Sequence, residues 1–195
     1  RLLFRICQKA GSRRLSRLVF SSVHKKMGGH IEICVCGGAA LDPEIGRGLA
    51  TLGLEVYEGY GMTETAPIIA FTRPGDYIPG SCGLPLQAVD CRIIDGEICV
   101  KGPNVMLGYY KNEEETLQAI DEEGWLHTGD LGTIDKQGNI FIRGRKKTML
   151  LGANGQNVYP EEIEDVIATH TIFEESVVVQ RGEKLVALVD RKSVV

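Results

Sequence analysis

The sequence has few of the features that mark membrane, secreted or metal-caged proteins. No apolar run approaches the ~20 residues that span a bilayer, and the start shows no charged, apolar and small-residue signal pattern. The four histidines are scattered, and the six cysteines contain no CxxC pair: Cys7, Cys34, Cys36, Cys82, Cys91 and Cys99. We therefore expect buried, reduced thiols in a cytoplasmic protein, and no metal cage built from cysteine and histidine.

Acidic residues are missing from the first thirty positions, which carry eight Lys or Arg although the whole chain has a formal net charge of −4. Such a basic arm can indicate nucleic acid or an anionic membrane as partner. Aromatic residues for base stacking are sparse and no nucleic-acid-binding signature follows, so nucleic acid is not expected. We favour a helical piece of a larger domain whose acidic partners lie outside this chain, and leave peripheral membrane contact open. The chain has no initiator Met, and we expect a fragment.

The first seventy residues predict part of an α/β domain. Apolar spacing in residues 1–27 indicates one or two amphipathic helices, broken at Gly11-Ser12. Residues 31–36 predict a buried strand, 42–52 a helix capped by Asp42, and 54–57 a second strand. This succession is a βαβ unit, in which the two strands run parallel.

The loops after these two strands are candidate ligand sites, because ligands bind beyond the carboxyl ends of parallel strands. The first loop holds Gly38, Ala39 and Ala40, and the second covers residues 59–65. In the second loop Tyr60 offers a flat apolar face and Gly61 leaves room, while Thr63 offers a hydroxyl for a phosphate and Glu64 a hard oxygen for Mg²⁺. Taken alone, the same residues fit an ordinary glycine-rich turn.

From residue 71 the pattern changes to short strands separated by proline and glycine. Residues 89–94 and 97–101 predict strands joined by a tight Asp95-Gly96 turn, and 131–134 with 140–143 predict a second hairpin. We expect a small antiparallel, barrel-like subdomain, which also carries a short helix at 112–120.

The C-terminal residues predict a small α+β module. It comprises a strand at 148–151, a helix beginning near Pro160 and a hairpin of 176–180 with 185–189. The predicted units are a fragment of a large α/β domain (1–70), its β-rich subdomain (71–146) and the start of a small C-terminal domain (147–195). Oligomeric state is not predicted.

Asp130 is the strongest candidate for binding a sugar. It lies between glycines in the segment 127–132, HTGDLG, where a ligand can approach the backbone closely. A carboxylate can accept hydrogen bonds from both vicinal hydroxyls of a ribose. The strand that returns to Asp130 brings the bases of residues 143–147, which suit a phosphate. Composition alone fits a solvated hairpin with a charged turn equally well.

Five motifs in order resemble the acyl-adenylate-forming, or AMP-binding, superfamily. They are GGAAL (37–41), YGMTET (60–65), GPNVMLGYY (102–110), GWLHTGDLG (124–132) and IRGRKK (142–147). Within the superfamily, residues 102–110 and 154–164 are most similar to bacterial long-chain fatty-acid–CoA ligases. The resemblance implies a two-step reaction: a fatty acid and Mg-ATP give acyl-AMP and pyrophosphate, and the CoA thiol then displaces AMP.

The resemblance also implies roles for individual residues. Gly38, Ala39, Ala40 and Tyr60 would flank the adenine, and Gly61 would also belong to the nucleotide site. Thr63 would hold a phosphate and Glu64 would bind Mg²⁺. Asp130 would take the ribose hydroxyls, and Arg145 would contact ribose or phosphate. Lys147 resembles the hinge of a rotating small domain, whose loop would face CoA through Gly152, Asn154 and Gly155.

Departures from the family pattern predict that this chain alone is inactive. The upstream Ser/Thr/Gly-rich phosphate loop and the C-terminal lysine motif are not found, and the connection at Asp95 is short. Other readings stay open: an aryl-CoA ligase, a luciferase-like oxidase, an amino-acid-activating domain, or a non-catalytic nucleotide- or anion-binding module.

Overall fold

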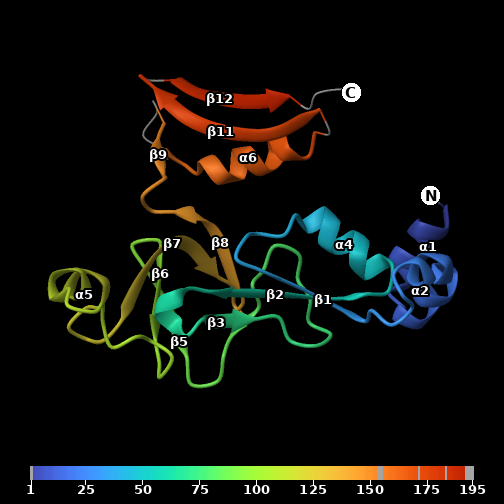
Figure 1. Cartoon of the computed structure of the whole chain (residues 1–195), viewed down its shortest axis with the longest axis horizontal. Coiled ribbons are helices and arrows are strands. Elements are labelled where there is room, and N and C mark those ends of the chain that lie inside the picture. Colours follow the sequence, from blue (N-terminus) through green and yellow to red (C-terminus); the bar gives the residue numbers. More distant parts are fainter. Residues whose placement is uncertain (1, 153–155, 171, 183, 192–195) are drawn as a thin grey trace.

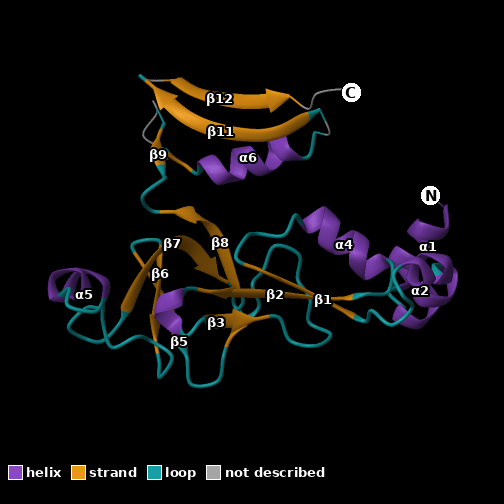
Figure 2. Ribbon diagram, in the orientation of Figure 1, coloured by secondary structure: helices purple, strands orange, loops and turns teal. Residues whose placement is uncertain are grey.

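The computed structural model describes residues 2–152, 156–170, 172–182 and 184–191. Two four-stranded sheets form the body of the molecule, with short helices at its two ends (Figure 1). A helix and a hairpin from the C-terminal part lie together above this body (Figure 2). This arrangement confirms the predicted mixture of α/β and α+β structure.

Three short helices, rather than one or two, form the N-terminal arm: α1 (Leu2–Ala10), α2 (Arg13–Val19) and α3 (Ser21–Lys26). Ser12 caps α2 by accepting a hydrogen bond from the Leu15 N–H, as its position after Gly11 suggests. The additional break lies at Phe20, whose φ of −101° and ψ of 24° depart from helical values. No helix in the described part of the chain is long and apolar enough to cross a bilayer.

One basic residue of the arm, Arg13, has acidic partners inside the chain, which corrects for this residue the expectation that they lie elsewhere. Arg13 forms ion pairs with Glu32 and Glu55, the first at 3.6 Å. Arg17 donates to the backbone carbonyl of Ile31 at 3.1 Å. These contacts attach α2 to the residues just before the first strand and to Glu55, the first residue of the second strand.

The βαβ unit forms as predicted. Strands β1 (Ile33–Gly37) and β2 (Glu55–Gly61) run parallel, with helix α4 (Pro43–Thr51) between them in sequence and Asp42 accepting from the Glu44 N–H as its N-cap. Antiparallel strands β3 (Ile68–Phe71) and β4 (Leu84–Pro85) complete the sheet order β1-β2-β3-β4. A short 3₁₀ turn (Thr63–Thr65) connects β2 to β3.

Two details of this sheet differ from the sequence prediction. The predicted buried strand β1 lies at the edge of the sheet, and its alternate residues Ile33 and Val35 are 52% and 66% exposed. Strand β2 continues through Gly61, so Tyr60 and Gly61 belong to a strand and not to a loop. Pairing with β3 extends β2: Tyr60 lies opposite Ala70, and a bulge follows before Gly61 pairs with Ile68.

The second sheet is antiparallel in the order β5-β6-β7-β8. Strands β5 (Asp90–Ile94) and β6 (Glu97–Lys101) meet at the predicted Asp95-Gly96 turn, where both residues have positive φ, as a tight hairpin turn requires. Strand β7 (Leu126–Ile134) pairs with β6 and with β8 (Ile140–Arg145). Helix α5 (Glu113–Ala119), capped by Asn112, precedes β7.

Strand β7 starts five residues earlier than predicted, so Asp130 lies within a strand instead of in a loop before one. Glycines made this stretch look like a loop. Gly129 adopts a φ of 73° within the strand, a left-handed conformation that L side chains rarely adopt. A bulge between Leu131 and Gly132 further bends the ladder.

One apolar core joins the two sheets, and its members come from β2, β3, β6 and β8 together with the turn before β5. They are Tyr60, Ile69, Ala70, Val89, Ile98, Val100 and Ile140. Tyr60 therefore contributes its ring to the core as well as its hydroxyl to the region around Asp130. The core explains how a strand of the first sheet is held beside a strand of the second.

The C-terminal residues form a helix packed on a hairpin. Helix α6 (Pro160–Ala168) packs on β11 (Phe173–Arg181), which pairs antiparallel with β12 (Lys184–Arg191). The Val178 N–H donates to Glu164 at 2.7 Å and so anchors helix to strand. The predicted strand at 148–151 is reduced to β9 (Leu150–Leu151), which pairs with β10 (Asn157–Val158). The boundaries at 70 and 146 remain predictions.

Truncating a core residue should lower the free energy of unfolding more than truncating an exposed residue does. Ile98 is fully buried, so Ile98→Ala should lower the free energy of unfolding by about 2–5 kcal/mol through lost burial and a residual cavity. Leu117 on α5 is 71% exposed. Leu117→Ala should therefore change the free energy of unfolding by about 0.5 kcal/mol at most. Urea unfolding followed by circular dichroism measures both values, and equal losses would contradict this assignment of the core.

Candidate functional site

Three predicted site residues meet around one carboxylate. The Tyr60 hydroxyl donates to Asp130 Oδ2 at 2.7 Å, and Arg145 Nε donates to Asp130 Oδ1 at 2.8 Å. Tyr60 and Asp130 are buried, whereas the Arg145 side chain is 57% exposed. The segments YGMTET and HTGDLG, seventy residues apart at these two positions, therefore converge in space.

Strand register explains this convergence. Asp130 on β7 lies directly opposite Arg145 on β8, so the two side chains project from a cross-strand pair. The Tyr60 side chain, from β2, lies next to them because the shared apolar core packs β2 on the second sheet. The Asp130 N–H donates to Thr128 Oγ1 at 3.1 Å, which fixes the backbone immediately before the carboxylate. We call Tyr60, Asp130 and Arg145 the carboxylate cluster.

The surroundings of the cluster oppose the ionisation of Asp130 and of Tyr60. Burial raises the pKa of Asp130 above its ordinary value, against the lowering effects of the Tyr60 hydrogen bond and the Arg145 charge. Burial and the charge of Asp130 also raise the pKa of Tyr60, so its hydroxyl remains a donor. Each oxygen of Asp130 already accepts one hydrogen bond and retains capacity for another. Arg145 is the more exposed of the two partners of Asp130.

Glu97 is a buried acid next to the cluster that no sequence motif marks. Its Oε1 accepts from the Gly129 N–H at 2.8 Å, and its Oε2 accepts from Lys146 Nζ at 2.9 Å. Burial opposes its ionisation, but hydrogen bonds from Lys146, Gly129 and His127 outweigh burial and lower the pKa of Glu97. Glu97 thus links Gly129, which precedes Asp130, to Lys146, which follows Arg145.

Glu64, the predicted Mg²⁺ ligand, faces a different partner. Tyr109 donates its hydroxyl to Glu64 Oε1 at 2.8 Å, and the Met106 N–H donates to the Glu64 carbonyl at 2.8 Å. The GPNVMLGYY segment therefore holds the YGMTET segment in place. Thr63 is exposed in the 3₁₀ turn. A side chain at Gly61 would meet the Pro67 carbonyl at 1.8 Å, so this close turn requires glycine.

The remaining predicted residues are exposed or lie at the ends of strands. Gly38, Ala39 and Ala40 follow β1, which ends with Gly37 opposite Gly59, so they start beside the end of β2. Lys147 is exposed in the turn after β8, and the Gly152 N–H donates to the Gln156 carbonyl. Asn154 and Gly155 lie outside the described residues, so their predicted role toward CoA has no structural counterpart here.

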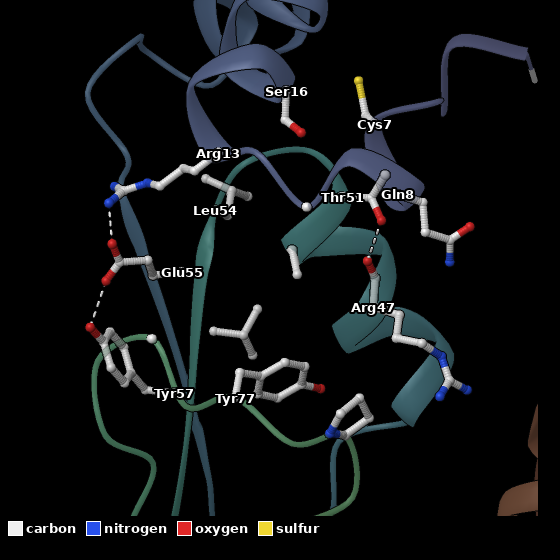
Figure 3. Close-up of a pocket in the computed structure, with 15 residues that line it drawn as sticks. Cys7, Gln8, Arg13, Ser16, Arg47, Thr51, Leu54, Glu55, Tyr57 and Tyr77 are labelled. Atoms are coloured by element: carbon white, nitrogen blue, oxygen red, sulfur yellow. Dashed lines mark hydrogen bonds and ion pairs between the residues drawn. The ribbon is translucent and has the colours of Figure 1, made fainter. Parts of the chain in front are cut away.

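A cavity of about 500 Å³ lies away from this cluster, between α1, α2, α4 and β2 (Figure 3). Arg13, Glu55 and Tyr57 form a chain of polar contacts on one side, and Tyr77 points in from the loop after β3. None of the predicted site residues lines it. The cavity is therefore separate from the carboxylate cluster.

Comparison with protein families shows to which family this chain belongs. The family described as AMP-binding enzyme matches residues 3–110, more than half of the chain. The chain belongs to the AMP-binding enzyme family. The match includes Tyr60, Thr63 and Glu64, while Asp130 and Arg145 lie beyond it.

Curated relatives and solved structures extend the similarity. Long-chain-fatty-acid–CoA ligase 6 of Rattus norvegicus is 42% identical over 162 residues, which cover 76% of this chain and 23% of the relative. Long-chain-fatty-acid–CoA ligase FadD15 of Mycobacterium tuberculosis is 38% identical over 164 residues, or 84% of this chain and 27% of the relative. ATP-bound MatB from Rhodopseudomonas palustris aligns at a TM-score of 0.77 and 34% identity, covering 94% of this chain and 40% of that one.

This chain therefore matches one segment of longer ligases. It spans about a quarter of the length of the curated relatives. The O-succinylbenzoate coenzyme A synthetase MenE of Bacillus subtilis, solved with AMP, aligns at a TM-score of 0.75 and 28% identity over 92% of this chain and 40% of that one. AMP-binding family membership accounts for the AMP-type motifs that the sequence shows.

The raised pKa of Asp130 gives a prediction about stability. The folded chain holds the Asp130 proton more strongly than the unfolded chain, so ionisation makes stability fall as pH rises between the ordinary pKa and the folded one. Asp130→Asn removes this cost. The variant should melt at a temperature equal to or above that of the wild type at pH 7, and the difference should shrink on acidification.

Asp135→Asn is the matched control on the same hairpin. Hydrogen bonds from Asn139 and from backbone N–H groups lower the pKa of Asp135, so its contribution is present above the ordinary pKa and lost as pH falls. This variant should melt lower than the wild type at pH 7. Thermal unfolding by circular dichroism at several pH values checks both, and a clear loss in Asp130→Asn would show that Asp130 serves stability.

Proposed function

We propose that this chain is the adenylate-handling segment of a long-chain fatty-acid–CoA ligase. The reaction converts ATP, a fatty acid and CoA to acyl-CoA, AMP and pyrophosphate through an acyl-adenylate. The observation that carries the proposal is the convergence of Tyr60, Asp130 and Arg145 on one buried carboxylate. Identities of 38–42% to long-chain ligases over most of this chain support the choice of fatty acid as substrate.

Asp130 is the proposed ribose ligand. Its two oxygens already accept hydrogen bonds from the Tyr60 hydroxyl and the Arg145 guanidinium. Two ribose hydroxyls would add to these donors or replace them. Arg145, more than half exposed, would then turn toward the phosphate, where a guanidinium binds oxygen pairs well. The phenol ring of Tyr60 would lie beside the adenine, with Gly38, Ala39 and Ala40 along the adjacent strand end.

Glu64 and Thr63 are the proposed residues for Mg²⁺ and phosphate. Glu64 is half-buried with one oxygen held by Tyr109, which leaves its other oxygen available to a hard cation such as Mg²⁺. The exposed Thr63 hydroxyl is adjacent and suits a phosphate oxygen. When bound, Mg²⁺ would neutralise the phosphates, and these side chains would keep them in position.

Lys147 is the proposed hinge, and the residues after it are proposed to change position between the two half-reactions. Lys147 is exposed in a turn directly after β8, so rotation of its backbone moves no buried side chain of its own. Rotation there would bring the segment that includes Gly152, Asn154 and Gly155 toward CoA. We further propose that this chain alone forms no acyl-CoA, and that the function is cytoplasmic or at a membrane surface.

The test uses the whole polypeptide that contains this sequence. Asp130→Asn should lower kcat/KM for ATP by about 10- to 100-fold, as expected for lost hydrogen bonds to a charged group. Asp135→Asn, which removes the same charge from the hairpin turn, should leave kcat/KM within about twofold. ATP–pyrophosphate exchange measures this step, and equal effects of the two substitutions would remove Asp130 from the nucleotide site.

The same exchange assay distinguishes the substrate classes. Fatty, aromatic and amino acids are compared at equal concentration, and the proposal expects the fatty acid to support the fastest exchange. A preference for aromatic or amino acids would assign the chain to another branch of the family. Failure of every acid, together with salt-sensitive binding of anionic vesicles by this chain, would favour a non-catalytic module that uses the basic arm.

A further inference from the structure

A second group of chemically reactive side chains lies beside the carboxylate cluster. Cys99 on β6 is directly opposite His127 on β7, and Glu97 lies two residues before Cys99. Residues two apart in a strand point to the same face, so all three side chains project together. Their thiol, imidazole and carboxylate ligand atoms lie within 4.8 Å of one another.

The distances suit a tetrahedral metal site. Cys99 Sγ is 3.5 Å from His127 Nδ1, which is 3.3 Å from Glu97 Oε2. Bonds to zinc of about 2.0–2.3 Å place neighbouring tetrahedral ligands roughly 3.3–3.8 Å apart. Sulfur, nitrogen and carboxylate oxygen are all ligands that Zn²⁺ accepts.

A further carboxylate orients the histidine. His127 Nε2 lies 3.6 Å from Asp121 Oδ2, and the Asp121 carboxylate is fixed by the N–H groups of Glu123 and Trp125. In the absence of metal, Nδ1–H donates to Glu97; with the ring proton on Nε2 and directed at Asp121, the Nδ1 lone pair becomes available to a metal between Cys99 and Glu97. Metal-binding histidines commonly have such a partner for the second ring nitrogen.

The Lys146 ammonium contacts Glu97 where a metal ion would bind. Its Nζ lies 2.9 Å from Glu97 Oε2, yet its side chain is 56% exposed and can turn into solvent. We propose that Glu97, Cys99 and His127 form a site for a thiophilic divalent metal, Zn²⁺ above all, which binds by displacing the Lys146 ammonium. The Cys99 thiol releases its proton to solvent, Glu97 binds as the carboxylate and His127 as the neutral ring. Water completes the coordination.

This site is distinct from the proposed function. Glu64 offers Mg²⁺ oxygen ligands alone, whereas the thiol and imidazole here select a softer metal. Binding is measured without substrate or turnover, so it stands or fails independently of ligase activity.

The first experiment titrates this chain with Co²⁺ and Zn²⁺. Co²⁺ should give a thiolate-to-cobalt absorption band, which excess Zn²⁺ should remove, and Zn²⁺ affinity by calorimetry should rise with pH because a proton leaves. Cys99→Ser should abolish the band. Cys91→Ser, on neighbouring strand β5 and outside the cluster, should retain it.

The second experiment tests the competing ammonium. Lys146→Ala should tighten Zn²⁺ binding about fivefold, the effect expected from removing an exposed ion-pair partner. Lys136→Ala, an exposed lysine in the β7–β8 turn, should leave affinity unchanged. Because Cys99 is buried, His127→Asn at a partly exposed position provides a second ligand variant. It should weaken Zn²⁺ binding by about tenfold or more.

Three results would overturn the site. One is Zn²⁺ affinity that is the same in the wild type and in a folded His127→Asn variant. Another is a cobalt band that survives Cys99→Ser. The third is Lys146→Ala binding Zn²⁺ no more tightly than Lys136→Ala, which would identify the group as a polar network closed by lysine alone.

Discussion

The carboxylate of Asp130 accepts hydrogen bonds from a side chain of each of the two sheets. A tyrosine from the first sheet and an arginine from the opposite strand of the second sheet each donate to one of its oxygens. The arrangement depends on the core beneath, because Tyr60 belongs to the apolar core that joins the sheets and its hydroxyl emerges at Asp130. Packing therefore sets the position of the donor, and strand register sets the position of the acceptor.

Two buried acids close together in the fold differ in the state their surroundings favour. Asp130 has a raised pKa because burial outweighs its two partners, whereas Glu97 has a lowered pKa because three donors outweigh burial. Glu97 accepts from the backbone N–H of Gly129 and from the exposed Lys146, while Asp130 accepts from the buried Tyr60 and the exposed Arg145.

The sequence predicted the parts of the fold that depend on local pattern. The βαβ unit, the Asp95-Gly96 turn and the cap at Asp42 follow from spacing and residue type, and the ordered motifs identified the family. It failed where glycine lies inside a strand: Gly61 and Gly129 led us to expect loops, although pairing with neighbouring strands extends β2 and β7 through them. The left-handed φ of Gly129 is compatible with the ladder because the Lys146 N–H donates to the Gly129 carbonyl.

Side-chain groups that depend on strand register were also beyond prediction. Glu97, Cys99 and His127 are up to thirty residues apart, and only the pairing of β6 with β7, including a register shift between Glu97 and Cys99, brings them together. The scattered histidines and the absence of a CxxC pair led us to expect no cysteine–histidine metal cage, and that rule counts neighbours in sequence, so it does not detect a group that spans two strands. Burial of β1 was likewise misjudged, since its apolar residues are covered only if another element lies over Ile33 and Val35.

The polar contacts between α6 and the residues of and after β8 lie at the surface of the protein. Arg143 pairs with Glu162 at 3.5 Å with both side chains half-exposed, and the Thr148 hydroxyl donates to Glu161 at 2.5 Å. An exposed ion pair contributes about 0–1 kcal/mol, far less than a buried apolar contact of similar size. Gly144 allows the close approach, because a Cβ there would lie 2.8 Å from Glu161. The ion pair and hydrogen bond of α6 are thus surface contacts, whereas the Tyr60–Asp130 junction is buried and continuous with the apolar core.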